Sequence, residues 1–150
     1  MRALVQRVSS ASVSVADERI AAIGPGLLVL LGIGHGDGEE TADRLARRLL
    51  ALRIFEGEGG RMERSVADTG GEVLCVSQFT LLGDLRRGNR PSFAAAAPPE
   101  LAEPLYERVR AALGAQGGRF GARMAVELVN DGPVTLLVEV RVPEGAGSGL

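Results

Sequence analysis

Residues 125–140 read AVELVNDGPVTLLVEV, with a polar segment between two runs typical of β-strands, Ala125 to Val129 and Val134 to Val142. An Asp-Gly pair between two such runs is typical of a hairpin turn. Pro133 complicates this interpretation because it has no N–H to give to a ladder, and because an X-Pro bond is where a cis peptide costs least. Gly132 carries no side chain, so its backbone is able to lie directly against a ligand. We therefore expect a tight turn whose functional groups are main-chain carbonyls.

The rest of the chain alternates between strand and helix patterns. Apolar runs predict strands at residues 4–15, 19–23, 27–33 and 72–79. Glu39 to Phe55 has apolar residues at helical spacing and predicts an amphipathic helix that ends at Gly57 to Gly60. A second helix is predicted from Pro98 to Leu113, with a kink or a later start at Pro104. Its apolar stripe consists of Leu101, Leu105, Val109 and Leu113. This order predicts an α+β fold, a barrel-like, mostly antiparallel β-sheet with two principal helices packed outside.

The composition limits the class of protein. A length of 150 residues predicts a single domain, which we place at residues 1–142, followed by a flexible tail at 143–150. A formal net charge of −2 gives no overall basic footprint, so any nucleic-acid contact must come from a local patch. One cysteine excludes an internal disulfide framework, and no apolar run reaches the length of a membrane span. We expect a soluble, cytoplasmic protein with no membrane partner.

The segment Gly32 to Gly38 lies between a predicted strand and a predicted helix, which is the position of a dinucleotide-binding loop. Its glycines fall on every second residue, so the pattern G-x-G-x-x-G is never completed, and we interpret the segment as a connection. His35 is the only histidine, and neither a nucleophile elbow nor a metal-ligand spacing accompanies it. The sequence therefore predicts no metal and no cofactor.

Ser77-Gln78-Phe79-Thr80-Leu81 places three polar side chains where a buried apolar strand is predicted to end. Strand ends are common places for binding sites, although the same residues also satisfy backbone groups at an ordinary strand end. No base lies near Thr80 in the sequence, so its hydroxyl has no partner that would make it a nucleophile. This favours substrate positioning and backbone electrostatics over covalent catalysis.

Two further groups have both a structural and a functional interpretation. Arg86, Arg87 and Arg90 cluster in one polar loop, which is either a solvated charged loop or a patch that contacts phosphate. Phe120 and Met124 are either ordinary core residues or one apolar wall of a site. The sequence alone leaves both alternatives open.

Ser77 to Leu81 and Asn130-Asp131-Gly132-Pro133-Val134-Thr135 together resemble the two signature motifs of the D-aminoacyl-tRNA deacylase (D-tyrosyl-tRNA deacylase) family. The likeness begins at Arg2-Ala3-Leu4-Val5-Gln6-Arg7-Val8, continues through Gly88-Asn89-Arg90-Pro91-Ser92-Phe93, and extends to Val140. Each motif alone is only suggestive. Two motifs at the right separation, with a matching opening segment, form a specific signal.

This resemblance implies a homodimeric enzyme that hydrolyses the ester joining a D-amino acid to the 3′ end of tRNA, and that also releases glycine mischarged on tRNA-Ala. It implies a cis Gly132-Pro133 bond and a motif that crosses the dimer interface into the partner's active site, where its carbonyls exclude L-amino acids. Arg7 is then the residue that braces the turn. The resemblance assigns the catalytic pocket to Ser77, Gln78, Phe79 and Thr80, and the remaining substrate contacts to Ala97, Phe120 and Met124.

Two other functions remain open at the level of sequence. One is a non-catalytic nucleic-acid-binding module that has the same fold. The other is a sibling editing enzyme that removes a wrong L-amino acid from tRNA, against which the Ser-Gln-Phe-Thr signature speaks. An assay of deacylation distinguishes a binding module from an enzyme. The enantiomer that is released distinguishes an editing enzyme for L-amino acids from one for D-amino acids.

Overall fold

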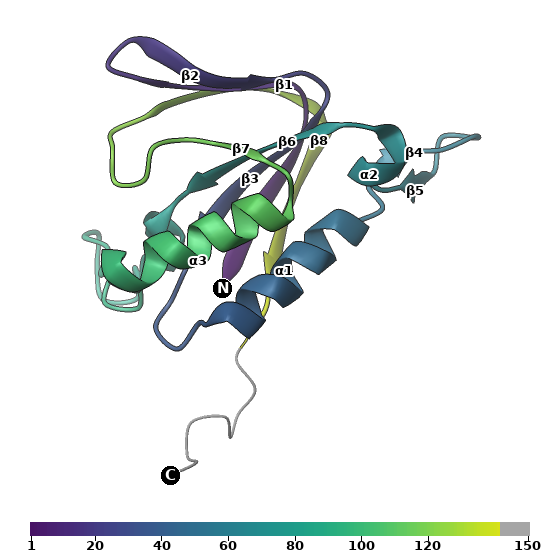
Figure 1. The fold of residues 1–150 in the computed structure, drawn as a ribbon. Helices are drawn as coiled ribbons and strands as arrows, with labels where there is room; N and C mark the ends of the chain where they lie inside the picture. Colours follow the sequence, from purple (N-terminus) through teal and green to yellow (C-terminus); the bar gives the residue numbers. More distant parts are fainter. Residues whose placement is uncertain (142–150) are drawn as a thin grey trace.

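The structure, a computed structural model, describes residues 1–141, so the predicted boundary at 142 and the predicted tail at 143–150 lie outside the described residues. Figure 1 shows a curved sheet with two helices side by side on one face. The elements in chain order are β1 (Arg2–Val15), β2 (Glu18–Ile23), β3 (Gly26–Gly32), α1 (Glu39–Ala51), β4 (Phe55–Glu56), β5 (Met62–Arg64), α2 (Val66–Thr69), β6 (Glu72–Ser77), the 3-10 helix η1 (Phe79–Leu82), α3 (Pro99–Ala112), β7 (Gln116–Gly117) and β8 (Ala125–Glu139).

The main sheet is organised around β1, whose 14 residues are long enough to serve several neighbours. The strand order is β2-β1-β3-β6-β7, and β8 pairs with the other side of β1. All pairings of β1 are antiparallel, whereas β3, β6 and β7 run parallel to one another. The N–H of Ala22 in β2 donates to Gln116 Oε1 in β7 (3.1 Å), and that of Gly24, just after β2, donates to Glu72 Oε1 in β6 (3.0 Å). The predicted α+β class and barrel-like, mostly antiparallel sheet are confirmed.

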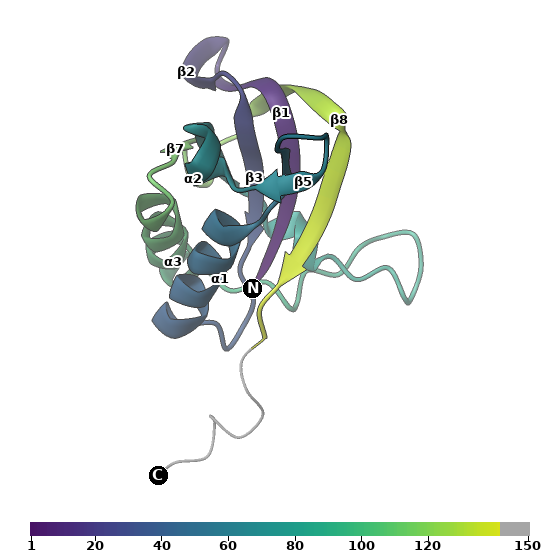
Figure 2. The ribbon, with the colours of Figure 1, turned by 90° about the vertical axis from the view of Figure 1, so that its right-hand side faces the viewer.

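Two apolar clusters lie on the two faces of this sheet, as the continuous apolar runs of β3 and β6 require. Val29 and Cys75 belong to the larger cluster, which α1 and α3 cover; Leu28 and Leu74 belong to a smaller cluster on the inner side of the curved sheet. Both strands are therefore buried on both sides. Figure 2 shows the resulting layers, with the helices on one side and β8 at the opposite edge.

The two long helices are those that the sequence predicts, with different ends. α1 ends at Ala51, so Phe55 lies in β4 instead of the helix, and Gly57 to Gly60 form the turn of the small β4–β5 hairpin. α3 begins at Pro99 and continues through Pro104, so the predicted later start is wrong. Leu101 is 39% exposed and is not part of the buried stripe. Among the described helices, none is long and apolar enough to cross a membrane.

The last strand differs most from prediction. Residues 125–139 do not fold back on themselves as a hairpin; both halves pair with β1, which makes β8 a single interrupted strand. Ser10 pairs with Val129 and Gln6 pairs with Thr135. Five residues lie between Val129 and Thr135, but only three lie between Gln6 and Ser10. The two extra residues of β8 must therefore leave the ladder as a bulged loop. The predicted turn is thus a loop on a strand edge.

Candidate active site

One cavity of about 580 Å³ collects most of the predicted site residues. Ser77, at the end of β6, and Gln78 and Phe79, at the start of η1, form one side. Phe120 and Met124 line it from the loop that follows β7, and Ala97 lines it from the segment before α3. The structure thus brings together Ser77, Gln78, Phe79, Ala97, Phe120 and Met124, from three separate parts of the sequence.

The local backbone explains how polar groups reach this cavity. The N–H of Gln78 donates to the carbonyl of Leu31 (2.8 Å), which extends the β3–β6 pairing by one residue. The chain then turns into η1, so the predicted strand at 72–79 ends two residues early, at Ser77. Because this turn is tight, Gln78 and Phe79 both face the cavity instead of alternating across the sheet.

Thr80 lies beside the cavity lining without belonging to it. It is an exposed residue of η1, and its hydroxyl accepts a hydrogen bond from the side-chain amide of Gln78. This contact joins Thr80 to a residue of the cavity lining. The predicted role of Thr80 in the site stays a prediction.

None of the residues that line the cavity, all within the described part of the chain, has a titratable side chain. The lining consists of aliphatic and aromatic groups, the Met124 thioether, Gly121 and the polar side chains of Ser77 and Gln78. His35 does not line the cavity; it is exposed, and its backbone N–H donates to the carbonyl of Ala95 (3.1 Å). No group of His, Cys, Asp and Glu suited to hold a metal ion occurs in residues 1–141. The lining of this chain therefore offers a hydroxyl and an amide but no acid or base.

Sequence reasoning missed part of the lining. Phe93, Ala96, Pro99 and Ala102 also line the cavity. Phe93 meets Phe79 edge to face, with ring centroids 5.0 Å apart, which stabilises the wall next to η1. A short backbone bridge between Gly34 and Ala96 holds this segment against the end of β3. Only Phe93 had a sequence signal, since it ends one of the segments that carry the family resemblance.

Two buried groups lie behind the cavity. The Tyr106 hydroxyl donates to the carbonyl of Cys75 (2.7 Å), which anchors α3 to β6. Burial raises the pKa of the Tyr106 hydroxyl and raises the pKa of the Cys75 thiol to about 12. Both groups therefore stay neutral near pH 7. The prediction that Cys75 is a small core residue agrees with its complete burial.

Gly132 and Pro133 lie apart from the cavity of their own chain. Both are exposed, the peptide bond between them is cis, and neither lines the cavity. Gly132 has a φ of +154°, and a Cβ on it would lie 2.5 Å from the Val134 nitrogen. Glycine is therefore required by both backbone conformation and space.

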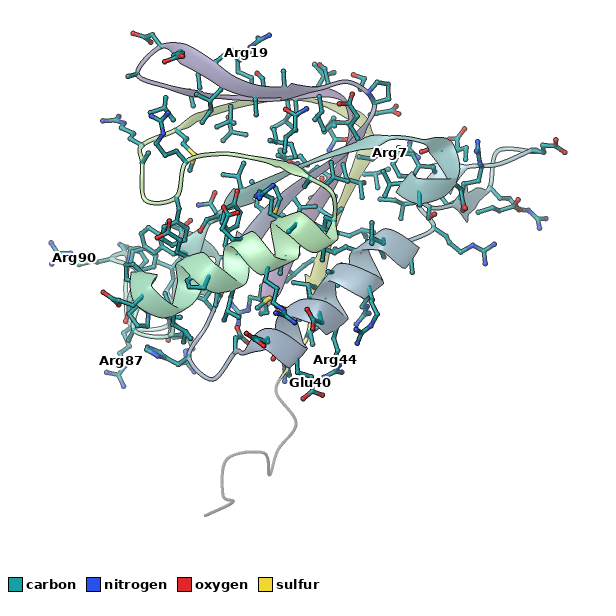
Figure 3. All side chains as sticks on the ribbon, viewed as in Figure 1. Arg7, Arg19, Glu40, Arg44, Arg87 and Arg90 are labelled. Atoms are coloured by element: carbon teal, nitrogen blue, oxygen red, sulfur yellow. The ribbon has the colours of Figure 1, made fainter. Side chains whose placement is uncertain are left out.

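Arg7 is buried (7% exposed) and supports this loop from β1. Its Nε donates to the carbonyl of Asp131 (2.9 Å), and its Nη1 donates to the carbonyl of Ile54 (2.7 Å). The guanidinium therefore ties the loop to the segment between α1 and β4. Figure 3 shows Arg7 on the opposite side of the molecule from Arg87 and Arg90. Arg7 thus contacts the loop and not the cavity.

A second hollow, of about 640 Å³, lies over β1, β2 and β8. It is lined by residues such as Ser12, Arg19 and Glu127, and it contains none of the predicted site residues. We therefore assign the candidate site to the first cavity.

Comparisons with known proteins agree on one family. The family model described as D-Tyr-tRNA(Tyr) deacylase matches residues 4–139. A D-aminoacyl-tRNA deacylase of Roseiflexus sp. (strain RS-1) is 59% identical over 144 residues, which is 93% of each chain. The protein of the same name from Heliobacterium modesticaldum is 57% identical over 146 residues, or 94% of this chain and 97% of the relative.

Solved structures give the same result for the fold. A structure titled c-Myc DNA Unwinding Element Binding Protein has a TM-score of 0.89 and 44% identity, and covers 95% of this chain and 100% of its own. A probable eukaryotic D-amino acid tRNA deacylase has a TM-score of 0.79 at 19% identity, covers 93% of this chain and 98% of its own, and supports the fold alone. With a family model that spans nearly all the described residues and relatives above half identity, the chain belongs to the D-Tyr-tRNA(Tyr) deacylase family.

Proposed function

We propose that this chain hydrolyses the ester bond between a D-amino acid and the 3′ end of tRNA. The observation that carries the proposal is the cavity in which Ser77, Gln78 and Phe79 meet the apolar wall of Phe120 and Met124. Such a cavity suits the flat apolar face of a terminal adenosine next to polar groups that orient an ester. Relatives named D-aminoacyl-tRNA deacylase at 57% and 59% identity support the same activity.

The chemistry matches a site without an acid or base. Water adds to the ester carbonyl, the carbon–oxygen bond to the ribose breaks, and the ribose oxygen leaves as a hydroxyl after taking a proton. An aminoacyl ester is already activated, so stabilisation of the oxyanion by backbone N–H groups supplies much of what is needed. The first N–H groups of a helix have no intrahelical acceptor, which makes the start of η1 the candidate donor. A ribose hydroxyl of the tRNA is the candidate for proton transfer, since the cavity lining holds no titratable side chain.

Selection for D-amino acids is assigned to Gly132 and Pro133, acting in the cavity of a second copy of the chain. In their own chain both residues are exposed and neither lines the cavity. Main-chain carbonyls held at the place of an L side chain exclude it by contact, whereas a D side chain points elsewhere. Glycine has no side chain to exclude, so glycine mischarged on tRNA-Ala is also released.

The edge of β8 supports the homodimer that this arrangement requires. Among the described residues β8 pairs only with β1, and Val129, Leu136 and Leu137 on it are 57%, 41% and 54% exposed. An apolar, unpaired strand edge is a common place for a second chain to associate. Sedimentation equilibrium tests this. A monomer at micromolar concentration contradicts the proposal that the Gly132-Pro133 loop acts in the cavity of a second copy of the chain.

The activity is tested with D-tyrosyl-, L-tyrosyl- and glycyl-tRNA and purified protein. We expect rapid release of D-tyrosine and glycine, with L-tyrosyl-tRNA surviving. Equal hydrolysis of both enantiomers contradicts chiral selection. A second candidate is a nucleic-acid-binding module without activity, which the DNA-binding title of the structure at 44% identity favours. Retention of tRNA in a gel shift without any deacylation would support that candidate instead.

A further inference from the structure

Two loops at the cavity carry arginines that the hydrolytic site does not use. Residues 83–93 lead from η1 to Phe93, and residues 117–124 lead from β7 to Met124, so both begin or end at the cavity lining. In Figure 1 both loops lie on the left of the molecule, and Figure 2 shows that residues 83–93 project to the side opposite β7. They hold the exposed arginines Arg86, Arg87, Arg90, Arg119 and Arg123.

The charge of these loops contrasts with that of the chain. Residues 83–93 contain three arginines and one aspartate, for a formal charge of +2, and residues 117–124 contain two arginines and no acid, for another +2. The chain as a whole has −2, so the remaining residues together carry −6. Positive charge is therefore concentrated beside the cavity, which is the local patch that an acidic nucleic-acid-binding protein needs.

One of the five arginines already has a carboxylate partner. Arg86 donates to both carboxylate oxygens of Asp84, at 2.7 to 3.0 Å, and this contact lowers the pKa of Asp84 to about 2. The base of the loop is closed by paired backbone hydrogen bonds between Asp84 and Ser92. Arg86 thus helps to shape the loop.

The other four have no such partner. No carboxylate among the described residues lies within 4.0 Å of Arg87, Arg90, Arg119 or Arg123. Figure 3 shows Arg87 and Arg90 pointing away from the body of the protein. Exposed arginines whose forks are free are suited to bidentate contacts with phosphate.

We propose that Arg87 and Arg90 on one loop, and Arg119 and Arg123 on the other, bind the phosphodiester backbone of the RNA strand that enters the cavity. This inference rests on the proposed function, because a 3′-terminal adenosine in the cavity places its own 5′ phosphate and the preceding phosphates of its strand at the cavity mouth. Contacts to phosphate carry no base information, so the two loops strengthen binding to many tRNAs without selecting among them.

The size of the effect follows from counterion release. Each phosphate contact to a single strand contributes about −0.7 to the slope of log affinity against log salt. Loss of two arginines from one loop is therefore expected to reduce the slope by roughly 1.4. Between 1 M and 0.1 M salt this slope change amounts to about 25-fold in affinity, so we expect the same variants to weaken tRNA binding at least tenfold at 0.1 M salt.

The experiment compares two double variants, Arg87→Gln with Arg90→Gln and Arg119→Gln with Arg123→Gln, with a matched control, Arg44→Gln with Arg48→Gln. The control removes the same charge from exposed positions on α1, and Figure 3 shows Arg44 on that helix, away from Arg87 and Arg90. For each protein, the Kd for deacylated tRNA is measured across a salt series. KM and kcat are measured with D-tyrosyl-tRNA and with D-tyrosyl-adenosine, which has no phosphate.

We expect the two loop variants, Arg87→Gln with Arg90→Gln and Arg119→Gln with Arg123→Gln, to raise the Kd and KM for tRNA at least tenfold and to reduce the salt slope. Their kcat and KM for D-tyrosyl-adenosine should change less than twofold. For the α1 control, the Kd and KM for tRNA should stay within twofold to threefold of those of the unaltered protein. An unchanged Kd for both loop variants, or an equal rise of the Kd in the α1 control, overturns the proposal. If the unaltered protein hydrolyses neither ester, the proposed function fails, while the tRNA Kd still decides the role of the arginines.

Discussion

Asn130 and Val134 are joined by two hydrogen bonds that close the loop carrying Gly132 and Pro133. The N–H of Val134 donates to Asn130 Oδ1 (2.8 Å), and Asn130 Nδ2 donates to the carbonyl of Val134 (3.1 Å). The side-chain amide of Asn130 thus satisfies the N–H and the carbonyl of Val134, as the backbone of a neighbouring strand would. The three residues between them are held as a short closed loop beside β1.

Replacement of Asn130 tests this closure. We expect Asn130→Ala to lower the free energy of unfolding by about 1–3 kcal/mol, because it leaves both backbone groups of Val134 without their partner. The D-over-L preference should fall as well, since a loosened loop no longer fixes its carbonyls. Asn130→Asp keeps the acceptor and loses the donor, and should give an intermediate result. Urea unfolding and paired deacylation assays measure the two effects, and an unaltered preference in Asn130→Ala would contradict a positioning role.

Arg7 should have a larger effect on stability. Arg7→Leu leaves the carbonyls of Asp131 and Ile54 without their charged donor, and we expect a loss of about 2–4 kcal/mol of unfolding free energy. Arg7→Lys keeps the charge in one ammonium that does not reproduce the two donors of the fork, so it should recover only part of the loss. Arg19→Leu, which removes an exposed arginine, is the control. Equal stability of Arg7→Leu and the control contradicts the bracing role.

Gly132→Ala tests the space available at the loop. An added Cβ meets the Val134 nitrogen at 2.5 Å in a backbone conformation that L side chains rarely adopt, so the loop must shift. We expect a smaller D-over-L ratio with a nearly unchanged circular dichroism spectrum, because the loop is exposed. Gly59→Ala, in the β4–β5 turn, is a control with positive φ and open space. The role of Gly132 fails if its alanine variant keeps the full enantiomer ratio.

The burial of Cys75 predicts an unreactive thiol. A pKa of about 12 in the folded state leaves almost no thiolate near neutral pH, and the side chain has no solvent exposure. We expect alkylation by iodoacetamide at pH 8 only after addition of guanidinium. In the unfolded chain this thiol titrates near the ordinary cysteine value of 9.0, so its contribution to stability falls as the pH rises from about 9 toward 12. Labelling of the native protein as fast as that of the unfolded chain contradicts this burial.

Those parts of the fold that depend on local pattern could be predicted from the sequence. The continuous apolar run after Pro25 becomes β3, buried on both faces, and helical spacing gives most of α1 and α3. The tight turn expected at Asp131-Gly132 is instead a bulged loop within one strand, because both halves of β8 pair with the long strand β1. This pairing involves residues more than a hundred positions apart, which no local signal records.

The candidate site shows the same division. Ser77 and Gln78 were singled out because they follow a buried apolar strand, and the family resemblance then assigned them to a pocket. Ala96 and Ala102 carry no local signal, and they reach the cavity only through the packing of distant segments. Asn130 was part of a recognised motif, but its role depends on the bulged loop, where the sequence predicted a tight turn between two strands.

Thr80→Ala decides between a chemical and a positioning role for the hydroxyl. The cavity lining holds no titratable side chain to take a proton from Thr80, and its hydroxyl instead accepts a hydrogen bond from Gln78. We therefore expect the rate of D-tyrosyl-tRNA hydrolysis to fall by less than about a hundredfold, mainly through a disordered Gln78 amide. Gln78→Ala should then cost at least as much, and the double variant little more than Gln78→Ala alone, since both residues act through one contact. Complete loss of activity in a folded Thr80→Ala protein, with Gln78→Ala still active, would make Thr80 a chemical participant.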